Sequence, residues 1–144
     1  MRPGNASLAA AAGLALAAAG CGSTCSDQTP PLKSAPSCEV LVSSQITVPL
    51  NVCPRCDQAA PRCLVHLDQE SLGQITLEPV SEVCDPSTSC PTVDPTTCPA
   101  TPLGCTFTAP GSPATYQLIV ATPAGVEQRT LTVIASGSPA GCSP

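Results

Sequence analysis

The chain of 144 residues is almost devoid of aromatic side chains: it contains one Phe, one Tyr and no Trp. A hydrophobic core must then consist of Val, Leu and Ile, which bury less surface per residue than aromatics do. Basic residues are also scarce, with five Lys and Arg against ten Asp and Glu. This balance argues against a nucleic-acid partner and against a polybasic membrane-binding patch. The 18 prolines argue against long helices.

A long apolar run is also missing. Residues 8–19 carry no charge and are mostly Ala and Leu, but they number only 12, fewer than the roughly 20 that span a bilayer. It follows a short segment whose one charged residue is Arg2. A positive start, a short apolar helix and small residues before a cleavage site predict a secretory signal peptide over residues 1–20.

The end of this segment, Ala18-Ala19-Gly20-Cys21, resembles the lipobox of bacterial lipoproteins, with Ala18 where Leu is usual. The resemblance implies cleavage between Gly20 and Cys21 and attachment of lipid to the Cys21 thiol. It also implies a protein that stays on its membrane, and Gly22 after the cysteine favours the outer membrane. Cleavage after Ala19, as in an ordinary secreted protein, remains an alternative, and both routes export the chain.

Removing residues 1–20, and Arg2 with them, leaves 124 residues with 4 basic and 10 acidic side chains, a formal charge of −6. This length predicts one folded domain. The segment from Gly22 to Ser37 is rich in polar residues and Pro, so residues 21–37 are predicted to form a disordered, lipidated tether. Residues 38–144 are predicted to form a cysteine-rich domain.

Ten cysteines follow Cys21, and we expect all of them to form disulfides. They are Cys25, Cys38, Cys53, Cys56, Cys63, Cys84, Cys90, Cys98, Cys105 and Cys142. Export leads to an oxidising compartment in which disulfides persist, and a small core needs them. Of eleven cysteines one must be left over, and Cys21 is the one whose thiol a lipid would use. The sequence alone does not determine the five pairs.

Alternating apolar and polar residues predict strands. The predicted strands cover residues 38–42, 45–52, 63–67, 75–78, 115–121 and 128–134, and the last two are predicted to form a hairpin. Pro49 cannot donate a ladder hydrogen bond, so its strand is predicted to lie at an edge or a bulge.

Residues 85–104 have no periodicity and contain a small repeat. Asp85-Pro-Ser-Thr-Ser-Cys90-Pro resembles Asp94-Pro-Thr-Thr-Cys98-Pro, and such steps form turns and extended segments. An unstructured loop of this length is unusual in a compact domain. We therefore expect Cys84 and Cys105 to close its base, with Cys90 bonded to Cys98 inside it.

Residues 109–118 resemble the E–F corner of immunoglobulin-like domains, in which a Tyr opens a strand. Tyr116 matches that residue, Leu118 stands at the position of the usual Cys, and the central Trp is missing. The predicted fold class is accordingly all-β: a small, disulfide-stapled, Ig-like β-sandwich behind a helical signal peptide.

Three groups of residues could carry chemistry. Cys53-Pro-Arg-Cys56 has the spacing of a redox-active pair, but no βαβ pattern surrounds it. Cys53, Cys56, Cys63 and His66 have a spacing that could bind zinc, although the thiols would have to be reduced. A hydrolytic site would need His66 with Asp68 or Asp57, and no serine lies in a nucleophile elbow.

We therefore expect a membrane-anchored cell-envelope lipoprotein with a structural or binding role, with no enzymatic activity, cofactor or metal. Its expected partners are the membrane, through Cys21, and an unidentified envelope protein or surface ligand. The alternative is a periplasmic thiol-disulfide or zinc-binding protein that uses Cys53, Cys56, Cys63 and His66.

Overall fold

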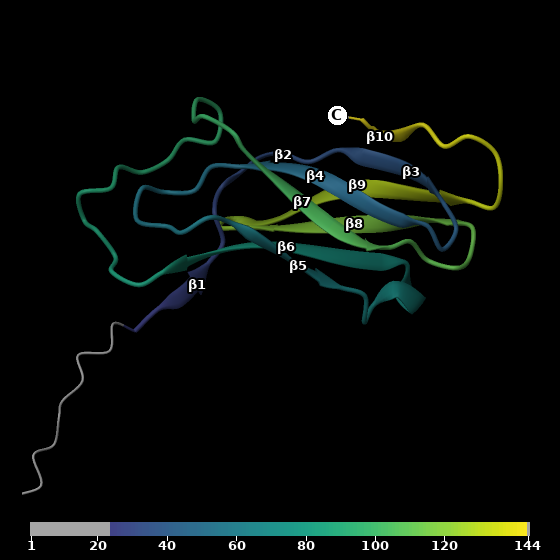
Figure 1. Cartoon of the computed structure of the whole chain (residues 1–144), viewed down its shortest axis with the longest axis horizontal. Coiled ribbons are helices and arrows are strands. Elements are labelled where there is room, and N and C mark those ends of the chain that lie inside the picture. Colours follow the sequence, from purple (N-terminus) through teal and green to yellow (C-terminus); the bar gives the residue numbers. More distant parts are fainter. Residues whose placement is uncertain (1–23, 144) are drawn as a thin grey trace, which may run out of the picture.

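Strands dominate the described part of the chain, residues 24–143 of a computed structural model (Figure 1). The strands are β1 (Ser26–Gln28), β2 (Leu32–Ser34), β3 (Ser37–Leu41), β4 (Gln45–Val52), β5 (Arg62–His66), β6 (Gln74–Val83), β7 (Thr101–Thr108), β8 (Ala114–Thr122), β9 (Gly125–Ile134) and β10 (Gly141–Ser143), and a short 3-10 helix, η1 (Glu70–Leu72), precedes β6. The predicted signal peptide, with its cleavage site at Gly20 and Cys21, lies outside the described residues.

The strands form two sheets. The larger sheet has the order β1-β6-β8-β9-β3-β10, with β5 also paired to β6, and it curls around the smaller sheet, β2-β4-β7 (Figure 1). The β8–β9 pair is an antiparallel hairpin, as predicted. Two other pairs, β3–β9 and β6–β8, are parallel. The all-β prediction is confirmed, but the pairing departs from the fully antiparallel sheets of an Ig domain.

The core lies between the sheets and is aliphatic. In β4, Ile46, Val48, Leu50 and Val52 are all buried and alternate with more exposed residues, as predicted. Leu118 and Val120 of β8 meet them from the larger sheet within the same core cluster. Alternation therefore determined which face of these strands is buried.

Pro49 lies in a strand with neighbours on both sides, because β4 is the central strand of the smaller sheet. Of the two predicted positions, an edge or a bulge, the edge was therefore wrong for β4 as a whole. The sheet tolerates Pro49 because β2 pairs only with Asn51 and Val52 of β4, and its register is irregular between Leu32 and Ser34. Pro49 therefore has a ladder neighbour only in β7.

Residues 24–37 are ordered against the domain, in contrast to the predicted tether. The β1 strand pairs with the end of β6, and β2 pairs with the end of β4. Leu32 and Ala35 enter the core. Both strands have only three residues, too few to show alternation, and their order depends on contacts that are distant in sequence.

Five disulfides use all ten cysteines that follow Cys21. The pairs are Cys25–Cys84, Cys38–Cys142, Cys53–Cys98, Cys56–Cys90 and Cys63–Cys105. The prediction of Cys84–Cys105 and Cys90–Cys98 was wrong. Cys105 lies inside β7 and its side chain meets β5 of the other sheet, whereas Cys84 follows β6 and is bonded to the residue before β1.

Candidate functional site

One end of the sandwich carries a long irregular segment, which we call the pinned loop: residues 84–100, between β6 and β7 (Figure 1). It is shorter than predicted, because β7 begins at Thr101 and continues the alternation of buried Leu103, Cys105 and Phe107. None of its residues is fully buried. The segment between β4 and β5 and the β8–β9 turn lie at the same end.

Two disulfides fasten the pinned loop to Cys53-Pro54-Arg55-Cys56. Cys53, which is buried at the end of β4, bonds Cys98, and Cys56 bonds Cys90. The sequence repeat thus has a structural meaning: each copy supplies one cysteine, and each cysteine takes one partner from the C-x-x-C motif. A redox-active C-x-x-C motif would require a disulfide between its own two cysteines. Cys53 and Cys56 are not bonded to each other.

Arg55 and Asp57 hold the first copy of the repeat. The Arg55 Nε and Nη2 atoms donate to the two Asp57 carboxylate oxygens at 3.1 and 3.0 Å. Asp57 Oδ2 also accepts the Ser87 backbone N–H at 3.0 Å, and Arg55 Nη2 donates to the Ser87 carbonyl at 3.2 Å. The Ser87 hydrogen bond, followed by the Arg55 guanidinium, lowers the pKa of Asp57, while burial opposes the shift.

Asp94 shapes the second copy of the repeat. Its Oδ1 atom accepts hydrogen bonds from the Thr96 backbone N–H at 2.8 Å and from the Thr96 hydroxyl at 2.7 Å. These two bonds lower the pKa of Asp94, and its carbonyl accepts the Cys98 N–H at 3.0 Å. The Lys33 ammonium of β2 donates to the Cys98 carbonyl at 2.6 Å. The Asp94 carboxylate thus stabilises a turn, and Lys33 connects this copy of the repeat to strand β2.

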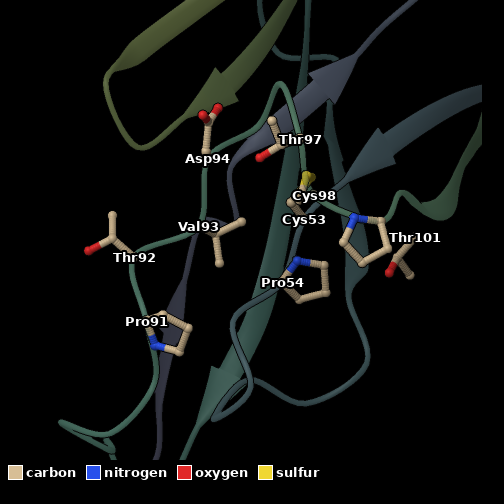
Figure 2. Close-up of a pocket in the computed structure, with 10 residues that line it drawn as sticks. Cys53, Pro54, Pro91, Thr92, Val93, Asp94, Thr97, Cys98 and Thr101 are labelled. Carbon is tan, nitrogen blue, oxygen red and sulfur yellow. A yellow bond between two sulfur atoms is a disulfide. The ribbon is translucent and has the colours of Figure 1, made fainter.

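A hollow of about 320 Å³ lies between the pinned loop and the end of β4. Figure 2 shows Val93 pointing into it toward Pro54, beside the Cys53–Cys98 disulfide. Its lining residues are Cys53, Pro54, Pro91, Thr92, Val93, Asp94, Thr97, Cys98, Pro99 and Thr101. Prolines and threonines dominate this wall, which carries one carboxylate and no basic side chain.

Two further hollows, of about 320 and 240 Å³, adjoin the first at Val93. Both also contact Pro31 and Pro123, the latter from the β8–β9 turn. The three hollows therefore form one uneven surface at this end of the molecule. Its lining is mainly apolar and neutral polar, with Asp94, Glu127 and Arg55 as the charged residues, and these are not clustered for acid–base or nucleophilic chemistry.

The structure does not bring the predicted zinc residues together. Cys53, Cys56 and Cys63 belong to three different disulfides, so none of them is a thiolate in this state. His66 lies on the outer face of β5, where its Nε2 atom is 2.8 Å from Glu78 Oε2. Each of these cysteines is bonded to a partner distant in sequence, which the spacing that suggested the alternative zinc site could not reveal.

Within residues 24–143, Cys25, Glu82 and Cys84 form a group close enough to share a metal ion. Cys25 and Cys84 are bonded to each other, so only the carboxylate of Glu82 is available as a ligand there. Two of the hydrolytic candidates have other partners: Asp57 pairs with Arg55, and His66 pairs with Glu78.

Comparison with known proteins identifies no relative: no family model, no curated protein and no solved structure matches the chain. The residues that the structure describes include no helix able to cross a membrane. Five disulfides in so short a domain place it in an oxidising, extracytoplasmic compartment.

Proposed function

We propose that this protein is a cell-envelope lipoprotein, anchored through lipid on Cys21, with a structural or binding role at the surface of a membrane, the outer membrane being favoured. The observation that carries the proposal is the cysteine pairing. The ten cysteines of the described domain pair among themselves. Cys21 is then the odd cysteine, and it stands where the lipobox resemblance requires one.

The candidate binding surface is the pinned loop with its three hollows. Binding residues are commonly placed on loops that a rigid scaffold positions, and here two disulfides and the Arg55–Asp57 pair provide that rigidity. The surface lacks catalytic geometry, which favours a binding or structural role over an enzymatic one.

The Ig-like resemblance belongs to the same proposal. In its support, the Tyr116 hydroxyl donates to the Ser112 carbonyl at 3.1 Å, four residues upstream, as the Tyr of an Ig corner does. The parallel β3–β9 and β6–β8 pairs would make it a divergent member of that architecture.

The anchor is tested on protein purified from its native membranes. Intact mass with and without thiol alkylation should show ten protected cysteines and an acyl-bearing Cys21. The variant Cys21→Ser should appear in the soluble fraction. A Cys21→Ser protein that stays with the membrane, or two alkylated thiols at Cys53 and Cys56, would refute the proposal, and the latter would favour thiol chemistry.

A further inference from the structure

The structure determines which end of the domain a lipid on Cys21 would hold at the membrane. In the β1–β6 pair, Gln28 lies opposite Ser81 and Ser26 lies opposite Val83. The chain before Ser26 therefore leaves the sheet at the end of β6 where the pinned loop begins. The Cys25–Cys84 disulfide fixes this exit covalently to the first residue of the loop.

The link from this exit to the lipid is short. Cys25 comes four residues after Cys21, and four residues span at most about 14 Å when fully extended. The opposite end of the sandwich is much farther away, because β6 has ten residues and each strand residue rises about 3.3 Å, roughly 30 Å in all. The link is thus too short for the opposite end of the sandwich to lie on the bilayer while the pinned-loop end is held away from it.

Resting on the lipid anchor proposed above, we propose that the pinned-loop end is the face of this domain that lies against the lipid surface. The tether enforces this orientation. The opposite end, with η1 and the turn between β7 and β8, faces away from the membrane (Figure 1).

The chemistry of the pinned-loop end fits neutral lipid headgroups. All four cations within residues 24–143 are engaged. Lys33 donates to the Cys98 carbonyl, and three ion pairs join Arg55 to Asp57, Arg62 to Asp27 and Arg129 to Glu127. Asp85 and Asp94 are exposed and form no ion pair within residues 24–143. Electrostatic attraction to anionic lipid therefore does not hold this face down, and its uncharged prolines and threonines suit a zwitterionic surface.

The absence of Trp makes the orientation directly measurable. A single Trp is introduced either at Thr92, in the pinned loop, or at Leu72, an exposed residue of η1 at the far end. Each lipidated variant is placed in phosphatidylcholine vesicles that contain a headgroup-attached quencher. Because the two sites are separated by about the length of β6, roughly 30 Å, quenching should be at least about twofold stronger for Thr92→Trp than for Leu72→Trp.

A longer tether provides the matched control. An insertion of about twenty Gly and Ser residues between Ser23 and Thr24 adds roughly 25 Å of mean reach. We expect it to remove the difference between the two Trp sites. A difference that persists would show that the loop itself binds lipid, and it would overturn an orientation enforced by the tether.

Vesicle flotation and intact mass separate this inference from the anchor. A protein that floats and carries acyl chains, but is quenched equally or more strongly at Leu72→Trp, refutes the orientation and leaves the anchor standing. A protein that does not float refutes the anchor. An orientation seen in native envelope membranes but lost in pure lipid would assign the loop to a membrane-protein partner and overturn the lipid contact.

Discussion

The strands and the pinned loop of this domain are held in place by different forces. The strands bury an aliphatic core between two sheets, with Leu50, Leu77 and Leu118 fully inaccessible. The pinned loop has no fully buried residue and is held by three disulfides, which end at Cys84, Cys90 and Cys98, and by the Arg55–Asp57 pair and the Asp94 turn. The strands thus combine hydrophobic burial with two disulfides, Cys38–Cys142 and Cys63–Cys105, whereas the loop relies on disulfides and polar contacts without a buried core. The two regions should therefore fail under different changes.

The largest effect is expected from the core. The variant Leu118→Ala removes a fully buried side chain where the two sheets meet. We expect it to lower the free energy of unfolding by about 2–5 kcal/mol, measured by urea denaturation. The control Leu72→Ala, at a residue that is 75% exposed, should change stability by less than about 0.5 kcal/mol. Similar losses in both variants would contradict a core at this position.

Removing one loop disulfide should act mainly on the loop. We expect Cys56→Ala combined with Cys90→Ala to cost about 2–4 kcal/mol at most. Limited proteolysis should then cut within residues 85–97 while the remaining strands stay folded. The matched control, Cys38→Ala with Cys142→Ala, affects strands β3 and β10 instead and should leave the loop resistant. A loop that stays uncut in the Cys56 and Cys90 variant would show that other contacts suffice.

The Tyr116 corner joins a buried ring to the β7–β8 connection through a hydrogen bond from its hydroxyl. The variant Tyr116→Phe keeps the ring and removes the bond to the Ser112 carbonyl. We expect a loss of about 1 kcal/mol, seen in the midpoint of thermal or urea unfolding. An unchanged midpoint would mean that the hydroxyl is equally well hydrated in the unfolded chain.

At Ser81 of β6, a substitution should increase the stability of the domain instead of lowering it. The Ser81 side chain is completely buried, and its hydroxyl has no hydrogen-bond partner among the described residues. Because burying an unsatisfied hydroxyl is unfavourable, Ser81→Ala should raise the free energy of unfolding by up to about 1 kcal/mol. Destabilisation in the same measurement would reveal a partner for the hydroxyl.

Acid should loosen the pinned loop before the body. The pKa of Asp57 is lowered in the folded protein from its ordinary value near 3.8, chiefly by the Ser87 hydrogen bond. Its ionised form therefore stabilises the folded loop above that value, and the contribution is lost as the pH falls through the lower, folded pKa. Hydrogen exchange of the Ser87 amide should quicken, relative to body amides, below about pH 4. Asp57→Asn should abolish this extra pH dependence, and its persistence would rule out Asp57 as the group responsible.

The repeating pattern of side chains made the body predictable. Alternation along residues 45–52 and 115–134 specified strands, a hairpin and the buried faces, because a strand with one buried face must repeat every two residues. The same signal was present in Leu103, Cys105 and Phe107 and would have found β7. It was obscured because Pro102 and Gly104, which disfavour strands, occupy the outward positions.

The candidate site was predictable only in part. The Pro, Thr and Cys content of the loop, and its repeat, marked it as irregular and disulfide-bound. The partners were not accessible, because each disulfide joins residues between 34 and 104 positions apart, and only the packing of the two sheets brings those residues together. The contact of Arg55 and Asp57 with Ser87 was not predictable for the same reason: it joins residues about 30 positions apart that only the packing brings together.

By itself, the sequence determined an all-β domain with an aliphatic core and an even set of disulfide-forming cysteines, since local alternation and cysteine number are properties of the chain. Tertiary structure alone decided which cysteines meet, that β6 and β8 run parallel, and that residues 24–37 join the sheets. These features depend on contacts between distant segments, and the free energy of such contacts comes from the packed whole. The exit of the chain beside Cys84 is another such feature, and it determines which end of the domain a lipid on Cys21 would hold at the membrane.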